Sequence, residues 1–420
     1  MERGEPRARS VAVCPQCALT QHLPKLSRGG AARCARCGYE LLARRPDRRA
    51  PTLALTLTGL ILFAIVHAFP LLTLRLRGQT TQATVLSGVT ELWAQGHWAV
   101  AAAVAATTVL VPGLQLLALL AVSLLPARGR TGSWIARGLR GLRQLSPWGM
   151  MDVFMIGVLV AIAKLSDLAS VVPGPALFAL AALIFVVAGA RASLDPEKSW
   201  QRLAPAAVSP PRPHVSASWC RCTVCELTVS RPDADAISRC LRCGALLRHR
   251  KPYSVQRTWA LLLAAAMLYV PANLYPILSV TSFGRVQADT ILSGVSFLLH
   301  HDMLPLAVVV FVASVLVPLL KILLLLALLL SVQWRLCWQP RARTALYRFA
   351  EAIGRWSMVD LYVVTILVAL VRFERVAQIE AEMGALFFGA VVVLTMGAAL
   401  SFDPRLIWDA PRDGRDDERA

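Results

Sequence analysis

Long apolar runs alternate with short polar segments along most of this chain. Each run holds about 20 residues, enough for a helix to cross a hydrocarbon layer of about 30 Å. Backbone polar groups inside a bilayer have no water to bind, so helices are expected there and open strands are not. The pattern predicts eight membrane-spanning helices, of which the fourth is the shortest: Leu53–Leu74, Trp98–Leu125, Gly149–Ala169, Ala176–Ala190, Thr258–Val280, Leu304–Val332, Ser357–Val376 and Gly384–Ser401.

Internal repetition divides these eight helices into two units of four. Because each unit has an even number of crossings, we expect both to run in the same direction, related by an axis along the membrane normal. Four motifs of the first half return in the same order in the second half: Leu86-Ser87-Gly88-Val89 as Leu292-Ser293-Gly294-Val295, Val111-Pro112 as Val317-Pro318, Trp148-Gly149-Met150-Met151-Asp152 as Trp356-Ser357-Met358-Val359-Asp360, and Asp195-Pro196 as Asp403-Pro404.

Composition and charge give these helices an orientation. The chain is 56% hydrophobic and 16% charged, with a formal net charge of +19. Such a charge would suit a nucleic-acid-binding protein, but the Lys and Arg residues gather in alternate loops, which is the pattern that orients membrane helices. The first fifty residues are polar and do not resemble a secretory signal. We therefore expect both termini in the cytosol, and no nucleic-acid partner.

Eight of the ten cysteines form four Cys-x-x-Cys pairs. Two residues between cysteines let both sulfurs of a turn face one point about 2.3 Å away, and two such turns complete a tetrahedron around zinc. A closed four-cysteine site leaves no position for substrate, so the metal should be structural. Iron bound by the same thiolates, or thiol–disulfide exchange, are the alternatives. The predicted ligands are Cys14, Cys17, Cys34 and Cys37 in the first set, and Cys222, Cys225, Cys240 and Cys243 in the second.

These patterns together predict an all-α polytopic membrane protein built from two tandem parallel repeats. Each repeat is a cytosolic, zinc-ribbon-like four-cysteine knuckle followed by four transmembrane helices. A proline-rich segment, semi-rigid by composition, links the repeats. The predicted boundaries are a first knuckle at 1–50, a first helical unit at 51–196, a linker at 197–218, a second knuckle at 219–251, a second helical unit at 252–404 and a polar tail at 405–420.

Charged residues within the apolar runs are candidates for function, because a charge at the centre of a bilayer costs about 2.5–3.5 kcal/mol on insertion scales. Lys321 lies well inside the sixth predicted helix, where the first unit has Gln115. A buried structural pair with Asp360 is the alternative reading of Lys321. Asp152 and Asp360 begin the third and seventh helices, where helix capping or reaching towards lipid head groups would also explain them. Asn273 adds a hydrogen-bonding side chain beside a proline kink.

The paired cysteine knuckles, the segment Pro271-Ala272-Asn273-Leu274-Tyr275-Pro276 and the two Leu-Ser-Gly sites resemble the paraquat-inducible protein A family. The resemblance runs from Cys14 to about Asp403. It implies a multi-pass protein of the bacterial inner membrane that works with a periplasm-spanning MCE-domain protein. On this reading the partners are that protein and membrane lipids. The expectation of zinc at the two metal sites comes from the cysteine spacing, with iron as the alternative. The candidate residues for a lipid pathway are Lys321, Asp360, Asn273, Pro276, Ser293 and Asp152.

One departure from the family pattern bears on the roles of the two units. The first unit reads Val66-His67-Ala68-Phe69-Pro70, without the asparagine or the first proline of the second unit. Since the first unit also has Gln115 in place of Lys321, we expect the second unit to carry more of any lipid pathway.

The function implied by this resemblance is that of an inner-membrane subunit of an intermembrane phospholipid transport system. It would load or unload lipid for the MCE-domain partner and so support envelope integrity. No Gly-x-x-x-x-Gly-Lys-Ser/Thr loop is present in the sequence, so ATP hydrolysis by that route is not expected. Nor do we expect an enzyme with catalytic residues. A membrane thiol–disulfide oxidoreductase and a non-transporting membrane anchor or scaffold are the alternatives.

Overall fold

The computed structural model describes residues 11–24, 27, 29–43, 49–76, 79–124, 138–141, 143, 146–165, 170–194, 199–200, 218–231, 238–282, 285–300, 304–336, 338–373 and 377–409. The repeated Asp195-Pro196 motif, most of the predicted linker at 197–218 and most of the tail at 405–420 lie outside these residues.

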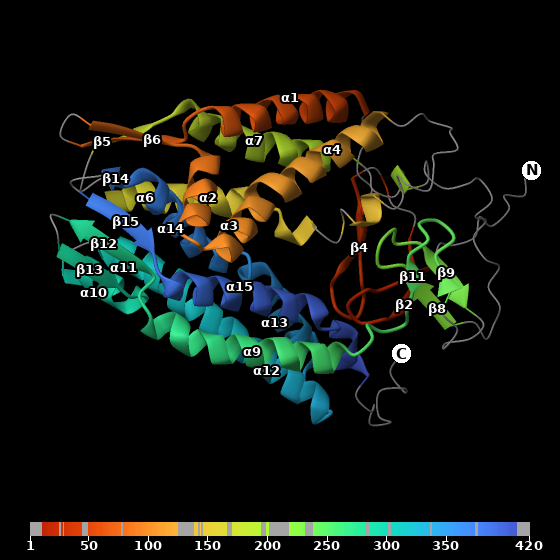
Figure 1. The fold of residues 1–420 in the computed structure, drawn as a ribbon. Coiled ribbons are helices and arrows are strands. Elements are labelled where there is room, and N and C mark those ends of the chain that lie inside the picture. Colours follow the sequence, from red (N-terminus) through yellow and green to blue (C-terminus); the bar gives the residue numbers. More distant parts are fainter. Residues whose placement is uncertain are drawn as a thin grey trace, which may run out of the picture.

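Eight helical segments of the described chain are long and apolar enough to cross a membrane, as predicted. They form one elongated bundle, in which helices of the two units lie against each other (Figure 1). The spans of the first unit are α1 (Arg49–Ala68), the continuous α3 (Trp98–Ala105), η1 (Ala106–Leu110) and α4 (Val111–Leu124), then α6 (Met151–Leu165) and α7 (Pro175–Ala192); those of the second are α9 (Ser254–Leu274), the continuous α11 (Leu304–Phe311), η3 (Val312–Leu316) and α12 (Val317–Gln333), then α14 (Val359–Leu370) and α15 (Met383–Ser401).

The seventh span is built differently from its prediction. Helix α14 has only 12 residues. The helical stretch begins earlier, with the amphipathic and charged α13 (Pro340–Ile353) and the short 3-10 helix η4 (Trp356–Met358). Because Gly354 and Arg355 interrupt the helix between α13 and η4, this span is a broken helix and not a single rod.

A proline explains the wide π-helical turn in the second span of each unit. The turns η1 and η3 end directly before Val111-Pro112 and Val317-Pro318. Proline has no backbone N–H to donate to the preceding turn, and its ring crowds the carbonyl four residues back. The chain accommodates it with a π turn, which leaves backbone carbonyls of that turn free for other donors. In the second unit the Tyr269 hydroxyl donates to one of them, the Val315 carbonyl, at 3.1 Å.

Two antiparallel sheets join the helices at one end of the bundle, so the all-α prediction is wrong (Figure 1). The predicted spans ran too far into segments such as Leu72-Thr73-Leu74-Arg75-Leu76, where polar and apolar residues alternate with the period of a strand. We call this the sheet end. The first sheet has the order β6-β5-β7, from β5 (Leu72–Leu76), β6 (Gln79–Ala83) and β7 (Ser170–Pro173); the second has the order β13-β12-β15-β14, from β12 (Leu278–Ser282), β13 (Arg285–Asp289), β14 (Arg372–Phe373) and β15 (Ala377–Ala381).

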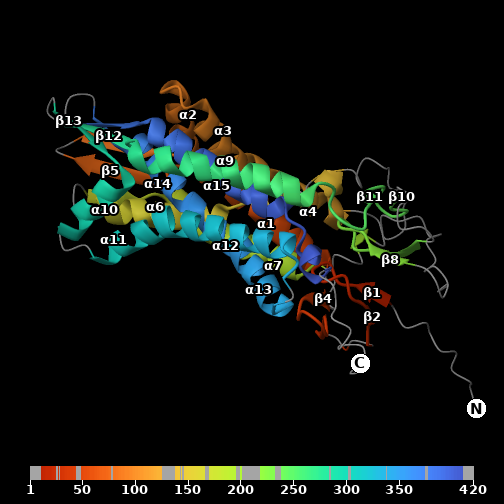
Figure 2. The same ribbon diagram turned by 90° about the horizontal axis from the view of Figure 1, so that it is seen from below.

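The two cysteine knuckles lie together at the opposite end, which we call the knuckle end (Figures 1 and 2). Each knuckle consists of two short antiparallel hairpins, with one Cys-x-x-Cys turn per hairpin. The hairpins of the first knuckle are β1 (Val11–Val13) with β2 (Thr20–His22) and β3 (Ala31–Arg33) with β4 (Glu40–Ala43); those of the second are β8 (Ser218–Arg221) with β9 (Thr228–Arg231) and β10 (Ser238–Arg239) with β11 (Leu246–Leu247).

The centre of the bundle is formed by α6 and α14, the third helix of each unit, which pack against each other. Phe154 and Tyr362 meet there edge to face, with ring centroids 5.3 Å apart. The surroundings of this pair are not symmetric. Helix α2 (Val85–Ala94) of the first unit packs on α14, whereas its counterpart α10 (Ile291–His300) packs mainly on α11.

This asymmetry predicts opposite effects for the same substitution in the two Leu-Ser-Gly motifs. A methyl group on Gly88 would lie 2.5 Å from the Thr365 methyl carbon and 2.8 Å from the Thr365 carbonyl oxygen, but one on Gly294 would meet no atom within 4 Å. Gly88→Ala should therefore destabilise the fold by about 1–3 kcal/mol. Gly294→Ala should stabilise it by up to about 1 kcal/mol, through helix propensity. Thermal unfolding in detergent measures both. Equal shifts in melting temperature for the two variants would contradict the asymmetric packing.

Candidate functional site

Each cysteine set gathers into a compact group of four sulfurs. All four Sγ atoms of a group lie within 4.8 Å of one another. Sulfur–sulfur distances are 3.5 Å for both Cys14–Cys37 and Cys17–Cys34, and in the second group 3.5 Å for Cys222–Cys243 and 3.4 Å for Cys225–Cys240. A zinc tetrahedron with bonds of about 2.3 Å has edges of about 3.8 Å, whereas a disulfide joins two sulfurs at about 2.05 Å. Both clusters therefore fit a tetrahedral metal ion.

One turn geometry is used four times to aim these sulfurs. The residue after the second cysteine of each turn has a left-handed backbone: Ala18, Gly38, Glu226 and Gly244 have φ of 58°, 72°, 62° and 70°. Each donates its N–H to the carbonyl of the first cysteine of its turn, at 2.7–3.1 Å. Glycine at two of these positions is the expected choice. Alanine and glutamate do not signal a left-handed backbone, so the sequence did not indicate that Ala18 and Glu226 share the conformation of the two glycines.

The thiols of each group share hydrogen bonds, which favours one thiolate over the others. The hydrogen bond from Cys17 lowers the pKa of the Cys14 thiol to about 5. In the second group the hydrogen bonds from Cys225, Cys240 and Cys243 lower the pKa of Cys222. The same hydrogen bonds raise the pKa of Cys17 and of Cys225. Each group therefore offers one ready thiolate, and a metal ion that binds all four sulfurs displaces the remaining protons.

Each knuckle is held by the helical part of the other unit. Arg140, in the segment before α6, donates to the Cys243 carbonyl of the second knuckle at 2.8 Å. Arg348, on α13 of the second unit, donates to the Cys37 carbonyl of the first knuckle at 2.6 Å. Arg140 lies 12 residues before Asp152 and Arg348 lies 12 residues before Asp360, so the two arginines are equivalent in the repeat. We call this reciprocal pair of contacts the cross-brace.

Two tryptophans extend the cross-brace. Trp200 follows the last helix of the first unit and packs among the cysteines of the second knuckle. Trp408 ends the 3-10 helix η5 (Pro404–Trp408) of the second unit and packs against the first knuckle, where the Arg36 guanidinium lies 4.3 Å from its ring centroid. Both knuckles are thus fixed to the ends of helices from the unit to which they do not belong in sequence.

Arg221 joins the two knuckles to each other. It donates to the Val13 and Leu41 carbonyls of the first knuckle, at 3.4 and 3.2 Å, and pairs with Glu226 of its own knuckle at 2.7 Å. Glu226 also pairs with Arg143. Burial alone would raise the pKa of the Glu226 carboxyl, but Arg143 and Arg221 outweigh this effect and lower it. This contact between knuckles was not predicted.

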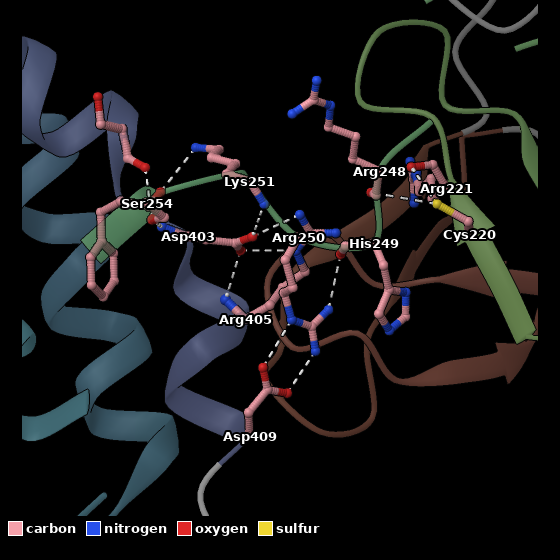
Figure 3. A network of polar contacts seen from close by, with 12 residues as sticks. Cys220, Arg221, Arg248, His249, Arg250, Lys251, Ser254, Asp403, Arg405 and Asp409 are labelled. Carbon is pink, nitrogen blue, oxygen red and sulfur yellow. Dashed lines mark hydrogen bonds and ion pairs between the residues drawn. The ribbon is translucent and has the colours of Figure 1, made fainter. Parts of the chain in front are cut away.

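A second polar network, drawn in Figure 3, connects the exit of the second knuckle to the end of α15. The buried Asp403 carboxylate accepts the backbone N–H of Lys251 at 3.0 Å and two guanidinium bonds from Arg405 at 2.8 Å. The Lys251 amine donates to the Leu400 and Phe402 carbonyls, at 2.7 and 2.9 Å. A cation at this position satisfies carbonyls at the end of the helix and interacts favourably with its dipole. Arg250 adds a bidentate pair with Asp409.

The environment of Asp403 gives a pH-dependent stability. Burial alone would raise the pKa of its carboxyl, but the bonds from Arg405 and Lys251 outweigh it and hold the pKa below its ordinary value. A lowered pKa contributes stability above the unfolded value of about 4, and this contribution is lost as pH falls through the folded value. Asp403→Asn should cost about 1–3 kcal/mol at pH 7. The difference from wild type should shrink below about pH 4.

Unfolding of the detergent-solubilised wild type and the variant in parallel between pH 7 and pH 3 measures this. Metal loss at acidic pH affects both proteins alike and cancels in the difference. A difference in unfolding free energy between the two proteins that stays constant from pH 7 to pH 3 would contradict the lowered pKa of Asp403.

Lys321 is fully buried, at 0% exposure, and its Nζ makes no hydrogen bond to the described residues. The amine packs against Gly354, where an added methyl group would lie 2.6 Å from Nζ. No ion pair joins Lys321 and Asp360 within the described chain, and the charge that acts on Asp360 is Lys164. The equivalent Gln115 is satisfied, since it donates to the Ser146 carbonyl at 3.4 Å and accepts from Arg191.

The remaining predicted candidates fall into three places. Asn273 donates to the Tyr269 carbonyl at 2.8 Å, and its Oδ1 is buried without a partner among the described residues. Pro276 and Ser293 lie at the sheet end, where the Pro276 carbonyl accepts from Gly384 at 3.0 Å and Ser293 forms a capping box with Thr290. Asp152 lines a cavity near the knuckle end. The structure therefore does not bring the six candidates into one site.

The comparisons with known proteins cover almost the whole chain. The family model described as "Paraquat-inducible protein A" matches residues 50–204 and 255–411. "Lipophilic envelope-spanning tunnel protein A" of Escherichia coli K12 is 33% identical over 403 residues, which are 96% of this chain and 92% of that protein. "Intermembrane transport protein PqiA" of the same strain is 33% identical over 425 residues, or 97% of each chain.

A "Probable intermembrane transport protein" of Haemophilus influenzae is 28% identical over 423 residues, or 95% of each chain. No solved structure matches. The family model matches both repeats, and the relatives align with the chain over nearly its full length. The chain therefore belongs to the paraquat-inducible protein A family.

Proposed function

We propose that this protein is an inner-membrane subunit of an intermembrane phospholipid transport system. It loads or unloads lipid for a periplasm-spanning MCE-domain partner and so supports envelope integrity. The names of the relatives, an envelope-spanning tunnel protein and intermembrane transport proteins, support the class of function.

The structural observation that carries the proposal is the uneven distribution of unsatisfied polar atoms within the spans. Among the described residues, and leaving aside Arg343, which has another interaction, the spans of the second unit bury six such atoms without a hydrogen bond, whereas those of the first unit bury one, His67 Nε2. Buried polar atoms are normally satisfied, so a cluster of exceptions needs a ligand, water or ion to explain it. The six atoms are Trp259 Nε1, Asn273 Oδ1, Ser314 Oγ, Lys321 Nζ, Arg348 Nε and Ser357 Oγ.

These atoms come from successive spans of the second unit, and contacts link them. Tyr269, which accepts from Asn273 through its carbonyl, donates its hydroxyl to η3, the turn that carries Ser314. The turn η3 packs against α14, the helix that carries Asp360. We infer that the second unit holds the path along which a polar head group is stabilised, with Lys321, Asp360 and Asn273 as its residues.

We further propose that the knuckles lie in the cytosol and hold one zinc ion each. The described basic residues Arg140, Arg143 and Arg348 lie at the knuckle end of the bundle, which supports this orientation, with both termini in the cytosol. In a reducing compartment eight closely grouped thiols are better suited to metal than to disulfides. The sheet end would then face the periplasm, where the partner is.

Gentle extraction of the protein from its native membrane tests the proposal. Phospholipid and an MCE-domain protein should co-purify with the wild-type chain, and bound phospholipid should fall when Lys321 is replaced by methionine. Recovery of neither phospholipid nor an MCE-domain protein would overturn the transport reading and favour an anchor.

A further inference from the structure

A cavity of about 360 Å³ lies between α6 and the broken seventh span, close to the knuckle end. From α6 it is lined by Asp152, Val153 and Ile156. The other wall is the end of α13 and the start of η4, with Arg348, Glu351 and Arg355 as its charged groups. The cavity is therefore formed between the two repeats and belongs to neither alone.

Three of the four charged groups that line this cavity have no hydrogen bond or ion pair within the described chain. Asp152, Glu351 and Arg355 make no ion pair or hydrogen bond within the described chain, although Glu351 and Arg355 are four residues apart on the same segment. Arg348 uses Nη2 for the Cys37 carbonyl, and its buried Nε has no partner there. Two positive and two negative groups thus face one space without neutralising each other at contact distance.

The cavity also has the amphipathic character of a membrane surface. Val153, Ile156 and Ala352 give it an apolar wall. Trp356 lines it while remaining 53% exposed, and tryptophan is enriched where a membrane protein meets the head-group layer. The cavity lies at the first turn of α6, which is where that membrane-spanning helix begins.

We propose that this cavity binds the head group of a zwitterionic amino-phospholipid from the cytosolic leaflet. Arg348 and Arg355 hold the phosphate, and Asp152 and Glu351 hold the amine. A guanidinium presents several donors in a fixed fork that suits phosphate oxygens. The carboxylates give the site a preference for a head group that carries a cation over one that is only anionic. The inference rests on the proposed lipid-transport function and adds a lipid class and a place of first binding.

Binding of phospholipids with a fluorescent acyl chain to the purified protein in detergent tests this site. The two probes are phosphatidylethanolamine and phosphatidylglycerol. Arg355→Gln should weaken both by about tenfold, since it removes a charge-assisted contact to the phosphate. Asp152→Asn and Glu351→Gln should each weaken only phosphatidylethanolamine, which reverses or erases the preference between the two lipids. Arg341→Gln is the matched control, because Arg341 is exposed on the same helix and does not line the cavity.

Three outcomes would overturn the inference, and each has a distinct meaning. Unchanged binding in all three cavity variants, with wild-type lipid transfer intact, removes this site and leaves the proposed function standing. Competition by glycerophosphoethanolamine as strong as by the lipid itself assigns the site to a soluble phosphate ester. Absence of any phospholipid binding to the wild type removes both the site and the transport proposal.

Discussion

Replacing Cys243 by serine should lower the zinc content of the purified protein from two ions per chain to one and unfold the second knuckle. A structural four-cysteine zinc site contributes about 10–16 kcal/mol of apparent binding free energy at neutral pH, and this free energy is also folding free energy in so small a domain. The Cys243 carbonyl accepts from Arg140, so loss of the turn also removes half of the cross-brace. Lipid transfer should fall with it. Metal analysis and limited proteolysis measure the two effects.

Cys220 provides the control for this variant. It is buried in the same knuckle, but it is not one of the four clustered sulfurs. Cys220→Ser should therefore keep two zinc ions. A wild-type protein that contained disulfides and no metal would contradict the metal assignment and support the oxidoreductase alternative. If the purified wild-type protein contained iron, the bound ion would be iron and the assignment of the site would stand.

Replacing Lys321 by methionine should stabilise the fold and abolish lipid transfer. The amine is buried without a partner among the described residues, so an apolar side chain of similar length removes an uncompensated desolvation cost of about 1–3 kcal/mol. If the same amine stabilises a lipid head group in passage, the gain in stability comes with a loss of function. Unfolding in detergent and lipid transfer, measured on the same preparation, test both halves.

The equivalent residue of the first unit gives the matched control. Gln115 is hydrogen-bonded to Ser146 and Arg191, so Gln115→Met leaves those partners unsatisfied and should destabilise the protein. Lys321→Met with normal transfer would show that the lysine is structural. A destabilised Lys321→Met would show that the amine has a partner in the membrane, such as water.

The sequence predicted the parts of the fold that depend on chemical composition. Runs of apolar residues located eight spans, and Cys-x-x-Cys spacing located both metal clusters, because hydrophobicity and thiol spacing act locally. The predicted helices extended wrongly into strands such as Leu72–Leu76. An alternating strand beside an apolar run contributes to the same hydropathy signal, so hydropathy alone does not separate the two.

The cross-brace could not be predicted in this way. Arg140 and Arg348 donate to backbone carbonyls, which every residue has, so no residue type on the acceptor side signals the contact. The repeat placed the two arginines in register, but it gave no sign that each would reach the other unit's knuckle. The same holds for Gly88 and Gly294, which are identical in motif and differ only in what packs on them.

Reconstituted lipid transfer tests whether this protein passes phospholipid to its partner. Vesicles that contain the full-length protein and a fluorescent phospholipid are mixed with the soluble MCE-domain protein of the same cell, and fluorescence that moves to the acceptor is measured. We expect transfer that requires the chain, is retained in Arg341→Gln and is lost in Lys321→Met. Transfer at the same rate from vesicles without the chain, or unchanged by Lys321→Met, would contradict it.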